Sequence, residues 1–375
     1  VTNGDFSAAG INLVSNPNFT DTGADAILNG NFSSGLLSPW TASASGTGVV
    51  PVVVADGLNY GVKIVQTGAS GTSYINQSLT LDIGTSYKFT YRIVSNDGGA
   101  LKITSPSITL DSTVGTRSIY FVADTTSFLI ERNSGITDVV ITDMTVEELG
   151  ADWTLGDGWS IGEDKAICDG TQTVQSNLYQ TGIVPINKSY KAVFDIVVDA
   201  GGMVIGIGGS NEQPIIEATG TYTLYSRATS GDSNFYFAAN STFVGSVTNV
   251  SVQELGEGWT IPLGWEVGAS VINSVSGNAS LSQDVSALDG VSYKVSFNLS
   301  AFTSGTLYVD IGSSVAQTEI TSGVKTLYFA SLGTGLLRFY GGSFIGSITN
   351  ITVQELDPNG YWTLGTGWSI GDTKA

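Results

Sequence analysis

The stretch FVGSVTNVSVQELGEGWTIPLGW, residues 243–265, decides the fold, because the same block returns twice more in the chain. It recurs as FIGSITNITVQELDPNGYWTLGTGW over residues 344–368 and, more loosely, as DVVITDMTVEELGADWTLGDGW over residues 138–159. Each copy combines an alternating strand pattern, a Glu-Leu pair, a short turn and two tryptophans. Such a long repeat indicates tandem modules, with the block running from the last strand of one module into the first strand of the next.

Further landmarks keep the same spacing of roughly a hundred residues, which is an ordinary size for one domain. They are the Tyr-Lys pairs beginning at Tyr87, Tyr190 and Tyr293, and the glutamines Gln77, Gln180 and Gln283. Between them, apolar and polar residues alternate, as in the segment from Tyr293 to Ser300, and no helical period competes. The sequence predicts an all-β chain of tandem β-sandwich modules with jelly-roll connectivity, arranged as a short rod.

The repeat also predicts the domain boundaries. Residues 1–26 form an N-terminal linker or edge segment, followed by β-sandwich modules at 27–150, 151–256 and 257–357. Residues 358–375 begin a fourth module. Because Val1 is not a methionine and this fourth module stops early, we expect both ends to belong to a longer polypeptide.

A smaller repeat occupies the first residues. The pattern Asn-[Gly/Pro]-[Asp/Asn]-Phe occurs at residues 3–6, 16–19 and 29–32, with a step of 13 residues. Asn followed by Gly or Pro turns the chain, and the Phe can then be buried. The third copy belongs to the first module. The first two copies are expected either to add short strands to the edge of that module or to link it to a preceding part.

The first module carries an insertion within TASASGTGVVPVVVADGLNYG, residues 41–61, where we expect a surface loop that includes Tyr60. Residues that occur in one module only are better ligand candidates than the repeated tryptophans. The candidate ligand-binding residues are Tyr60, Tyr74, Tyr179 and Tyr340. Trp153, Trp159, Trp259 and Trp265 are instead expected to close module ends or to pack at the junctions.

Composition excludes several function classes. The 375-residue chain has 33 acidic against 14 basic residues, a net charge of −19, so we expect no nucleic-acid partner and no binding to anionic membranes. It has no histidine and a single cysteine, Cys168, which leaves no Ser-His-Asp arrangement and no thiolate metal cluster. The sequence contains no apolar run long enough to predict membrane insertion. We therefore expect no enzymatic activity.

The module opening NGNFSSGLLSPW (29–40), the central segment from Gln77 to Lys88 and the closing ITDMTVEEL (141–149) resemble carbohydrate-binding modules of the galactose-binding-like jelly-roll type. The WTLGxGWSIG opening and the FVGSVTNVSVQEL closing are similar to tandem repeats in bacteriophage tail-fibre and other virion structural proteins. We expect no cofactor, and the resemblance adds a single candidate, a structural calcium in the first module. Its expected ligands are Asn29, Asn31 and Asp143, with Ser33 nearby.

The resemblance implies a virion structural or fibre protein on the particle surface, with other virion proteins and cell-surface glycans as partners. Two alternatives stay open. One is a bacterial protein, either a secreted or cell-surface adhesin or the accessory carbohydrate-binding modules of a polysaccharide-degrading enzyme. The other is a purely architectural capsid decoration or spacer. The sequence leaves the oligomeric state open.

Overall fold

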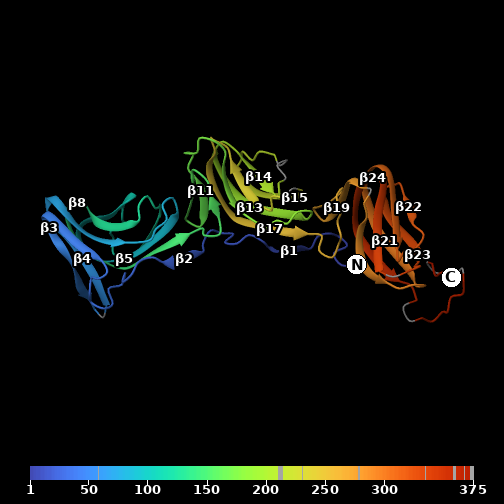
Figure 1. Cartoon of the computed structure of the whole chain (residues 1–375), viewed down its shortest axis with the longest axis horizontal. Coiled ribbons are helices and arrows are strands. Elements are labelled where there is room, and N and C mark those ends of the chain that lie inside the picture. Colours follow the sequence, from blue (N-terminus) through green and yellow to red (C-terminus); the bar gives the residue numbers. More distant parts are fainter. Residues whose placement is uncertain are drawn as a thin grey trace.

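The computed structural model describes residues 1–57, 59–209, 214–229, 231–277, 279–333, 335–357, 360–366 and 368–371. In these residues all regular secondary structure is β-strand. Figure 1 shows three β-sandwich bodies in a row, which makes the chain an elongated rod. The structure thus confirms the predicted all-β fold of tandem β-sandwich modules.

Module 2 shows the sandwich most simply, as two separate antiparallel sheets. The first sheet is β10 (Trp159–Gly162), β11 (Lys165–Cys168), β17 (Val244–Leu255), β13 (Ser189–Ala200) and β15 (Gly220–Arg227), in that order. The second sheet is β14 (Met203–Ile207), β16 (Phe235–Ala239), β12 (Ser176–Gln180) and β9 (Thr154–Leu155). Side chains from both sheets, such as Phe194 and Phe237, share one buried core.

Modules 1 and 3 have the same layout, but long strands bend from one sheet into the other. Module 1 contains β3 (Thr41–Asp56), β4 (Asn59–Ser78), β5 (Ser86–Thr104), β6 (Ser107–Thr109), β7 (Gly115–Val122) and β8 (Ser127–Leu149). Module 3 contains β18 (Trp265–Gly268), β19 (Val271–Gly277), β20 (Leu281–Ala287), β21 (Ser292–Ile311), β22 (Gln317–Glu319), β23 (Gly323–Ala330) and β24 (Gly335–Glu355). Shifts in the β21–β24 register between Ser300 and Thr306 mark the bend.

The expected surface loop of module 1 is instead a β-hairpin. Strands β3 and β4 pair from Thr41↔Asn76 out to Asp56↔Asn59. The inserted residues are rich in Val, which favours extended pairing over an irregular loop. Tyr60 therefore lies on a strand, close to the turn of this hairpin.

The first two Asn-x-x-Phe copies lie neither at the edge of module 1 nor in a link to a preceding part. Residues 1–26, here called the strap, run back along the rod past all three modules (Figure 1). The first copy packs in module 3, the second in module 2, and the third in module 1, which carries it in its own sequence. Two short strap strands join the first sheets: β1 (Ala9–Asn12) pairs with β17, and β2 (Thr22–Asp25) pairs with β8.

Each copy makes the same contacts in its module. Its Phe is at most 1% exposed and packs against the first tryptophan of the module. The ring-centroid distances are 5.3 Å for Phe6–Trp259, 5.1 Å for Phe19–Trp153 and 6.4 Å for Phe32–Trp40. The repeated glutamine holds the backbone of the residue before each copy's Asn through both its amide oxygen and its amide nitrogen: Gln283 holds Thr2, Gln180 holds Ser15 and Gln77 holds Leu28. Thus the strap supplies to modules 2 and 3 a segment that their own sequences lack.

The step of 13 residues between copies now has a physical reason. An extended chain rises about 3.3 Å per residue, so 13 residues reach at most about 43 Å, and the turn within each copy shortens this reach. A compact module of about 100 residues has a similar length, roughly 35–45 Å. One step of the strap therefore reaches from the binding place on one module to the equivalent place on the next.

The junctions between modules also repeat. Ser86, Ser189 and Ser292 each accept, through Oγ, a backbone N–H from the opening of the following module, from Ile161, Val267 and Ile370 at 2.9, 3.3 and 3.1 Å. Ile370, in the segment after module 3, therefore makes the contact with module 3 that Ile161 makes with module 1. Arg227, 5% exposed, adds hydrogen bonds to the carbonyls of Trp265 and Ile261 between modules 2 and 3.

Candidate functional site

The strands equivalent to the second sheet of module 2 carry different outward-facing side chains in the three modules. The strand registers align the modules, because Gln77 pairs with Phe128, Gln180 with Phe235 and Gln283 with Leu337. Side chains alternate between the two faces of a strand, so every second residue from these pairs points away from the core. The scaffold contacts of the modules repeat, whereas these outward positions carry different side chains. We call this surface of each module its variable face.

In module 2 the variable face holds two tyrosines side by side. Tyr179 on β12 pairs with Tyr236 on β16, and Tyr236 pairs with Gly206 on β14. A Cβ atom at Gly206 would lie 1.9 Å from Cζ of Tyr236, so the ring lies directly over this glycine. Burial raises the pKa of Tyr236. Only glycine allows the Tyr236 ring to lie flat on the sheet, which gives a low aromatic surface next to Tyr179.

In module 3 the variable face combines an aromatic pair with an ion pair. Tyr308 on β21 and Tyr340 on β24 are cross-strand partners whose rings stack at 5.4 Å with an angle of 13°. Beside them Arg338 Nε donates to Asp310 Oδ1 at 2.8 Å, and Asp310 is 1% exposed. Burial, followed by the negative charge of Asp310, raises the pKa of Tyr340. Because the carboxylate of Asp310 is buried, the guanidinium of its partner Arg338 is the accessible charged group beside the two rings.

The variable face of module 1 is less aromatic. Tyr74 on β4 pairs with Glu131 on β8, which in turn pairs with Lys102 on β5. Lys102 Nζ and Glu131 Oε1 lie 3.0 Å apart. The variable face of module 1 has one tyrosine, which lies next to an ion pair. The variable faces of modules 2 and 3 each have two tyrosines.

Three of the four predicted tyrosines therefore lie on variable faces: Tyr74, Tyr179 and Tyr340. Tyr60 does not, because it lies beside the β3–β4 turn with its ring 3.4 Å from a Cβ built at Gly35. The sequence analysis missed Tyr236 and Tyr308. Strand alternation could have found both, since Tyr236 lies between buried Phe235 and Phe237 and Tyr308 between buried Leu307 and Val309.

The structure argues against the expected calcium site in module 1. Asn29 and Asp143 are close in space, since the N–H of Met144 donates to the carbonyl of Gly30. The carboxylate of Asp143, however, accepts from Arg92 Nε at 2.7 Å. The side-chain nitrogen of Asn29 donates to the carbonyls of Leu36 and Ser38, and Asn31 caps the N–H of Ser33. The guanidinium of Arg92 thus supplies positive charge beside Asp143, where the calcium ion was expected.

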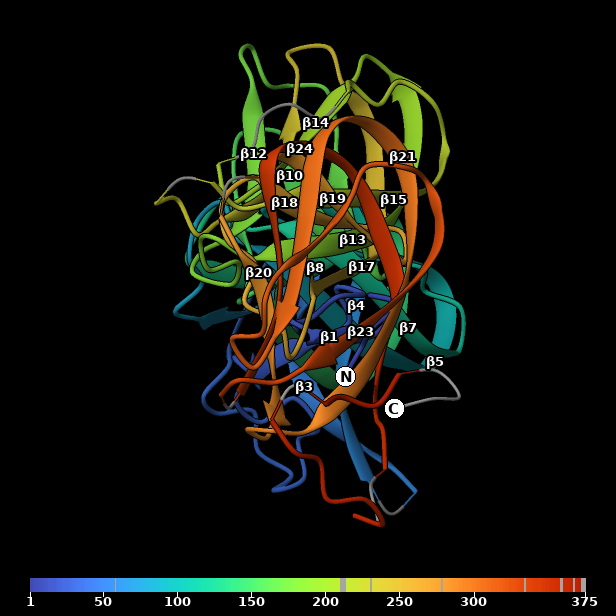
Figure 2. The same cartoon turned by 90° about the vertical axis from the view of Figure 1, so that its right-hand side faces the viewer.

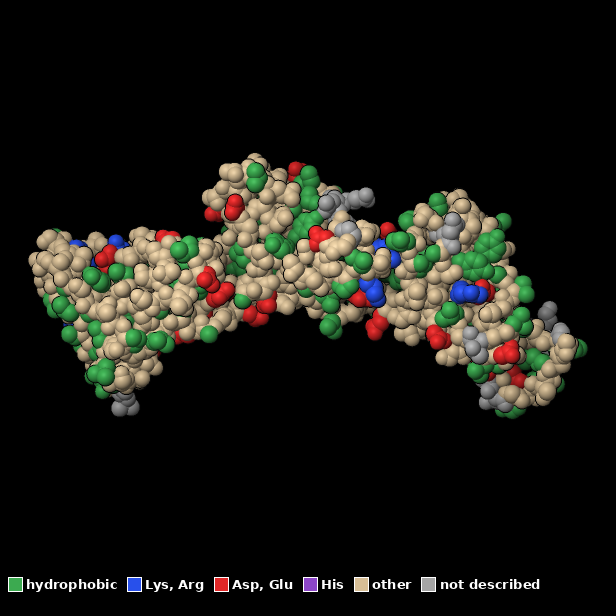
Figure 3. All heavy atoms as spheres, viewed as in Figure 1, with side chains coloured by type: hydrophobic (Ala, Val, Ile, Leu, Met, Phe, Trp, Pro, Cys, Tyr) green, Lys and Arg blue, Asp and Glu red, His purple; other side chains and the backbone are tan. Residues whose placement is uncertain are grey.

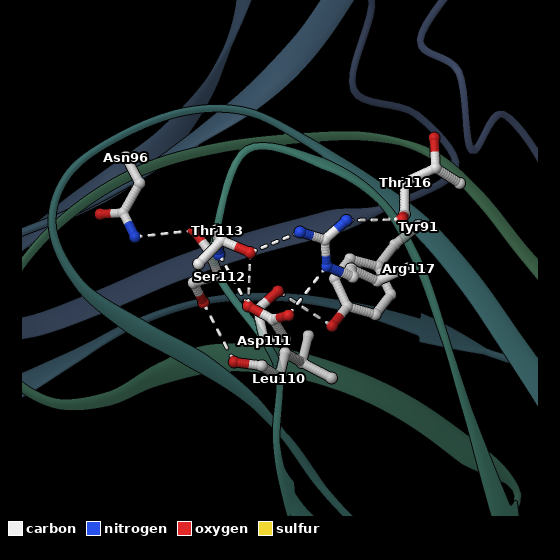
Figure 4. Close-up of polar contacts among 8 residues, drawn as sticks. All are labelled: Tyr91, Asn96, Leu110, Asp111, Ser112, Thr113, Thr116 and Arg117. Atoms are coloured by element: carbon white, nitrogen blue, oxygen red, sulfur yellow. Dashed lines mark hydrogen bonds and ion pairs between the residues drawn. The ribbon is translucent and has the colours of Figure 1, made fainter.

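A polar cluster of module 1, drawn in Figure 4, fixes a loop. Asp111 accepts from the N–H and hydroxyl of Thr113 and from Arg117 Nε at 2.8 Å, and these bonds, the Thr113 hydroxyl first, lower its pKa to about 2. Burial raises the pKa of Tyr91, whose hydroxyl donates to the Asp111 carbonyl, to about 12. At neutral pH Asp111 stays ionised and Tyr91 stays protonated. The cluster therefore holds the loop in place and is not an acid–base pair.

Charge over the rod matches the composition. On the face shown in Figure 3, acidic side chains are spread along the modules, and the few Lys and Arg side chains form no continuous patch. Among the described residues, no group of three or more Cys, Asp or Glu side chains could hold a metal ion. In the same residues there is no helix that could cross a membrane.

Comparison with known proteins gives similarities to solved structures and to no known family or curated protein. Among solved structures, the chain is similar to the N-terminal CBM22-1–CBM22-2 tandem domain from Paenibacillus barcinonensis Xyn10C, with 10% sequence identity and a TM-score of 0.27. The match covers 66% of this chain and 99% of that chain.

Proposed function

We propose that the chain is a non-enzymatic attachment rod that contacts glycans through the variable faces of modules 2 and 3. The carrying observation is the tyrosine pair on each face, placed at positions that the shared scaffold leaves free to differ. A flat aromatic ring offers an apolar surface to the C–H face of a sugar ring, and its hydroxyl offers a hydrogen bond. Next to the module 3 pair, Arg338 can donate to sugar hydroxyls.

The rod shape supports the same proposal. A single exposed face of this size binds a sugar weakly, because little surface is buried on binding. Several such faces on one stiff rod raise the total attachment strength through effective concentration. The hydrogen bonds that repeat at the junctions hold the faces at fixed spacing. The rod therefore suits a surface that presents glycans at high density.

Binding should depend on the tyrosine pairs. We expect Tyr236→Ala and the double change Tyr308→Ala/Tyr340→Ala each to weaken binding to a recognised glycan at least tenfold, since stacking area is lost. The measurement is a glycan array at high protein density, followed by titration calorimetry on the sugars that bind. Tyr60→Ala is the matched control and should leave binding unchanged, because Tyr60 lies off the variable faces. A blank array, or unchanged binding by both variants, would contradict the proposal.

The finer part of the proposal is that the rod belongs to the surface of a bacteriophage particle. It rests on the resemblance of the closing and opening segments, such as residues 243–265, to repeats of tail-fibre and virion proteins. Mass spectrometry of purified particles should then find peptides of this chain in stoichiometric amounts. Finding the chain instead joined to a polysaccharide-degrading domain, or anchored on a bacterial cell, would replace this placement by the bacterial alternative.

A further inference from the structure

We propose that the variable face of module 3 selects an acidic sugar, a pyranose that carries a carboxylate on its ring. The guanidinium of Arg338 binds the carboxylate, and the pair of Tyr308 and Tyr340 supports the sugar ring. The assignment rests on the proposed function, since it names the sugar class that one of the two faces selects.

Three neighbouring strands place the guanidinium next to the tyrosines. On β24, Arg338 pairs with Ser282 of β20 and with Asp310 of β21, and two residues further along Tyr340 pairs with Tyr308 of β21. Residues two apart on a strand point to the same side and lie about 7 Å from each other. Figure 2 views the rod from its module 3 end, with these three strands toward the viewer. The cation and the aromatic pair therefore form adjacent rows of one surface.

The ion pair in the first row presents its cation to solvent and not its anion. The side chain of Arg338 is 38% exposed, whereas that of Asp310 is 2% exposed. Arg338 donates to Asp310 through Nε, at 2.8 Å. In the part of the chain that the structure describes, the two terminal nitrogens of Arg338 have no hydrogen-bond partner. A guanidinium with free terminal nitrogens can bind both oxygens of a carboxylate at once.

The shared scaffold does not require this ion pair. When the modules are aligned by their repeated glutamines, Arg338 stands where module 2 has Tyr236, and Asp310 stands where module 2 has Gly206. Module 2 builds the same sandwich with a ring over a glycine at this place. A partly buried ion pair adds little net stability, because desolvation of the two charges offsets their attraction. The pair in module 3 is therefore better explained by a ligand than by the fold.

The spacing of the two rows favours a carboxylate bonded directly to the sugar ring. A pyranose that stacks on Tyr340 lies about 7 Å along the strand from Arg338. A charge-assisted hydrogen bond covers about 2.8 Å of this distance, which leaves about one ring radius and one carbon–carbon bond for the sugar. A phosphate or sulfate ester is joined through an additional oxygen atom and holds its charge farther from the ring. A neutral hydroxyl reaches the guanidinium but gains nothing from its charge.

The acidic character of the rod is compatible with this selection. Charges more than about 10 Å away are largely screened at 0.1 M salt, so the groups in contact with the sugar decide. A further acidic side chain of this face, Asp284, pairs with Leu336 in the row beyond Arg338, on the side away from the tyrosines. A carboxylate held between Arg338 and Tyr340 is therefore nearer to the cation than to Asp284.

The test compares each acidic glycan with its own methyl ester, which keeps the shape of the sugar and removes the charge. The full chain is applied to an array of oligosaccharides that contain glucuronic, galacturonic or mannuronic acid, each in both forms, and titration calorimetry follows on those that bind. We expect at least one acid to bind at least tenfold more tightly than its ester. Sulfated and phosphorylated forms of the neutral parent sugars should bind no better than the esters.

A matched pair of variants assigns the preference to Arg338. The double change Arg338→Gln/Asp310→Asn removes both charges and keeps two groups that can hydrogen-bond, so no unpaired carboxylate is left buried. It should abolish the difference between acid and ester. Asp310→Asn alone keeps the guanidinium and should keep a preference of at least tenfold for the acid. Thermal unfolding by circular dichroism checks that both variants fold.

The possible outcomes separate this inference from the proposed function. Equal binding of acid and ester by the unmodified chain would overturn the inference and leave glycan binding in place. A preference that survives the double change, or tighter binding of a sulfate or phosphate than of the carboxylate, would overturn it as well. A blank array would contradict the proposed function itself, and the acidic-sugar site with it.

Discussion

Replacing Phe19 by Ala should lower the free energy of unfolding of module 2 by about 3–5 kcal/mol, the usual cost of emptying a buried Phe position. Phe19 is 1% exposed and lies in the core of module 2, although it is far from that module in sequence. Its ring meets Trp153 at 5.1 Å, and Trp153 in turn meets Phe237 at 6.3 Å. The substitution therefore opens a cavity between the strap and both layers of the core.

The effect is large because a single domain has only about 5–15 kcal/mol of stability. Chemical denaturation followed by tryptophan fluorescence measures the loss, since Trp153 and Trp159 report on module 2. Asn18→Ala is the matched control, because Asn18 is exposed in the same turn and should change stability by less than about 0.5 kcal/mol. If Phe19→Ala were as mild as Asn18→Ala, the strap would be a surface attachment and not part of the core.

Replacing Trp265 by Ala should destabilise module 3 by a similar amount, about 3–5 kcal/mol. Trp265 is 0% exposed, packs on Phe344 at 5.9 Å and donates from Nε1 to the Ala279 carbonyl at 2.9 Å. The substitution removes the ring and leaves that carbonyl without its bond. The expectation that the tryptophans serve the fold is met here, with the ring in the core of the module.

Trp368 provides an internal control for this prediction. It stands at the position of Trp265 in the repeat, but it is 63% exposed. Trp368→Ala should therefore change stability by less than about 0.5 kcal/mol. Thermal unfolding of both variants by circular dichroism makes the comparison. An equal loss of stability in the two variants would mean that the repeated tryptophan does not stabilise the module through burial of its ring.

The sequence predicts those parts of the fold that local pattern determines. Alternation predicts the strand from Tyr293 to Ser300, and the repeat of residues 243–265 predicts the modules and their order. Alternation also predicts which side chains point away from the core. The position of Tyr179 and Tyr340 on the variable faces follows from this rule. The same alternation places Tyr236 and Tyr308 on the outward side of their strands. That they lie beside Tyr179 and Tyr340 depends on cross-strand register, which a single sequence does not provide.

The path of the strap lies beyond such prediction. The Asn-x-x-Phe pattern shows that Phe6 and Phe19 are buried, but each could be buried against any of the three modules. What assigns them is the complementarity of Gln283 and Gln180 to the strap backbone, together with the 13-residue step between the copies. The ion pair of Arg92 with Asp143 is likewise long-range, and it overrides the local resemblance that suggested calcium.

The central claim is that the strap packs on the modules in reverse order, with its first copy in module 3 and its second in module 2. Hydrogen exchange of the Phe6→Ala variant tests this claim most directly. The claim predicts faster exchange at the far end of the sequence, in module 3, including the amide of Ile351, which donates to the Gly4 carbonyl. Protection in module 1, which directly follows the strap in sequence, should be unchanged. Lost protection in module 1 with none lost in module 3 would contradict the account.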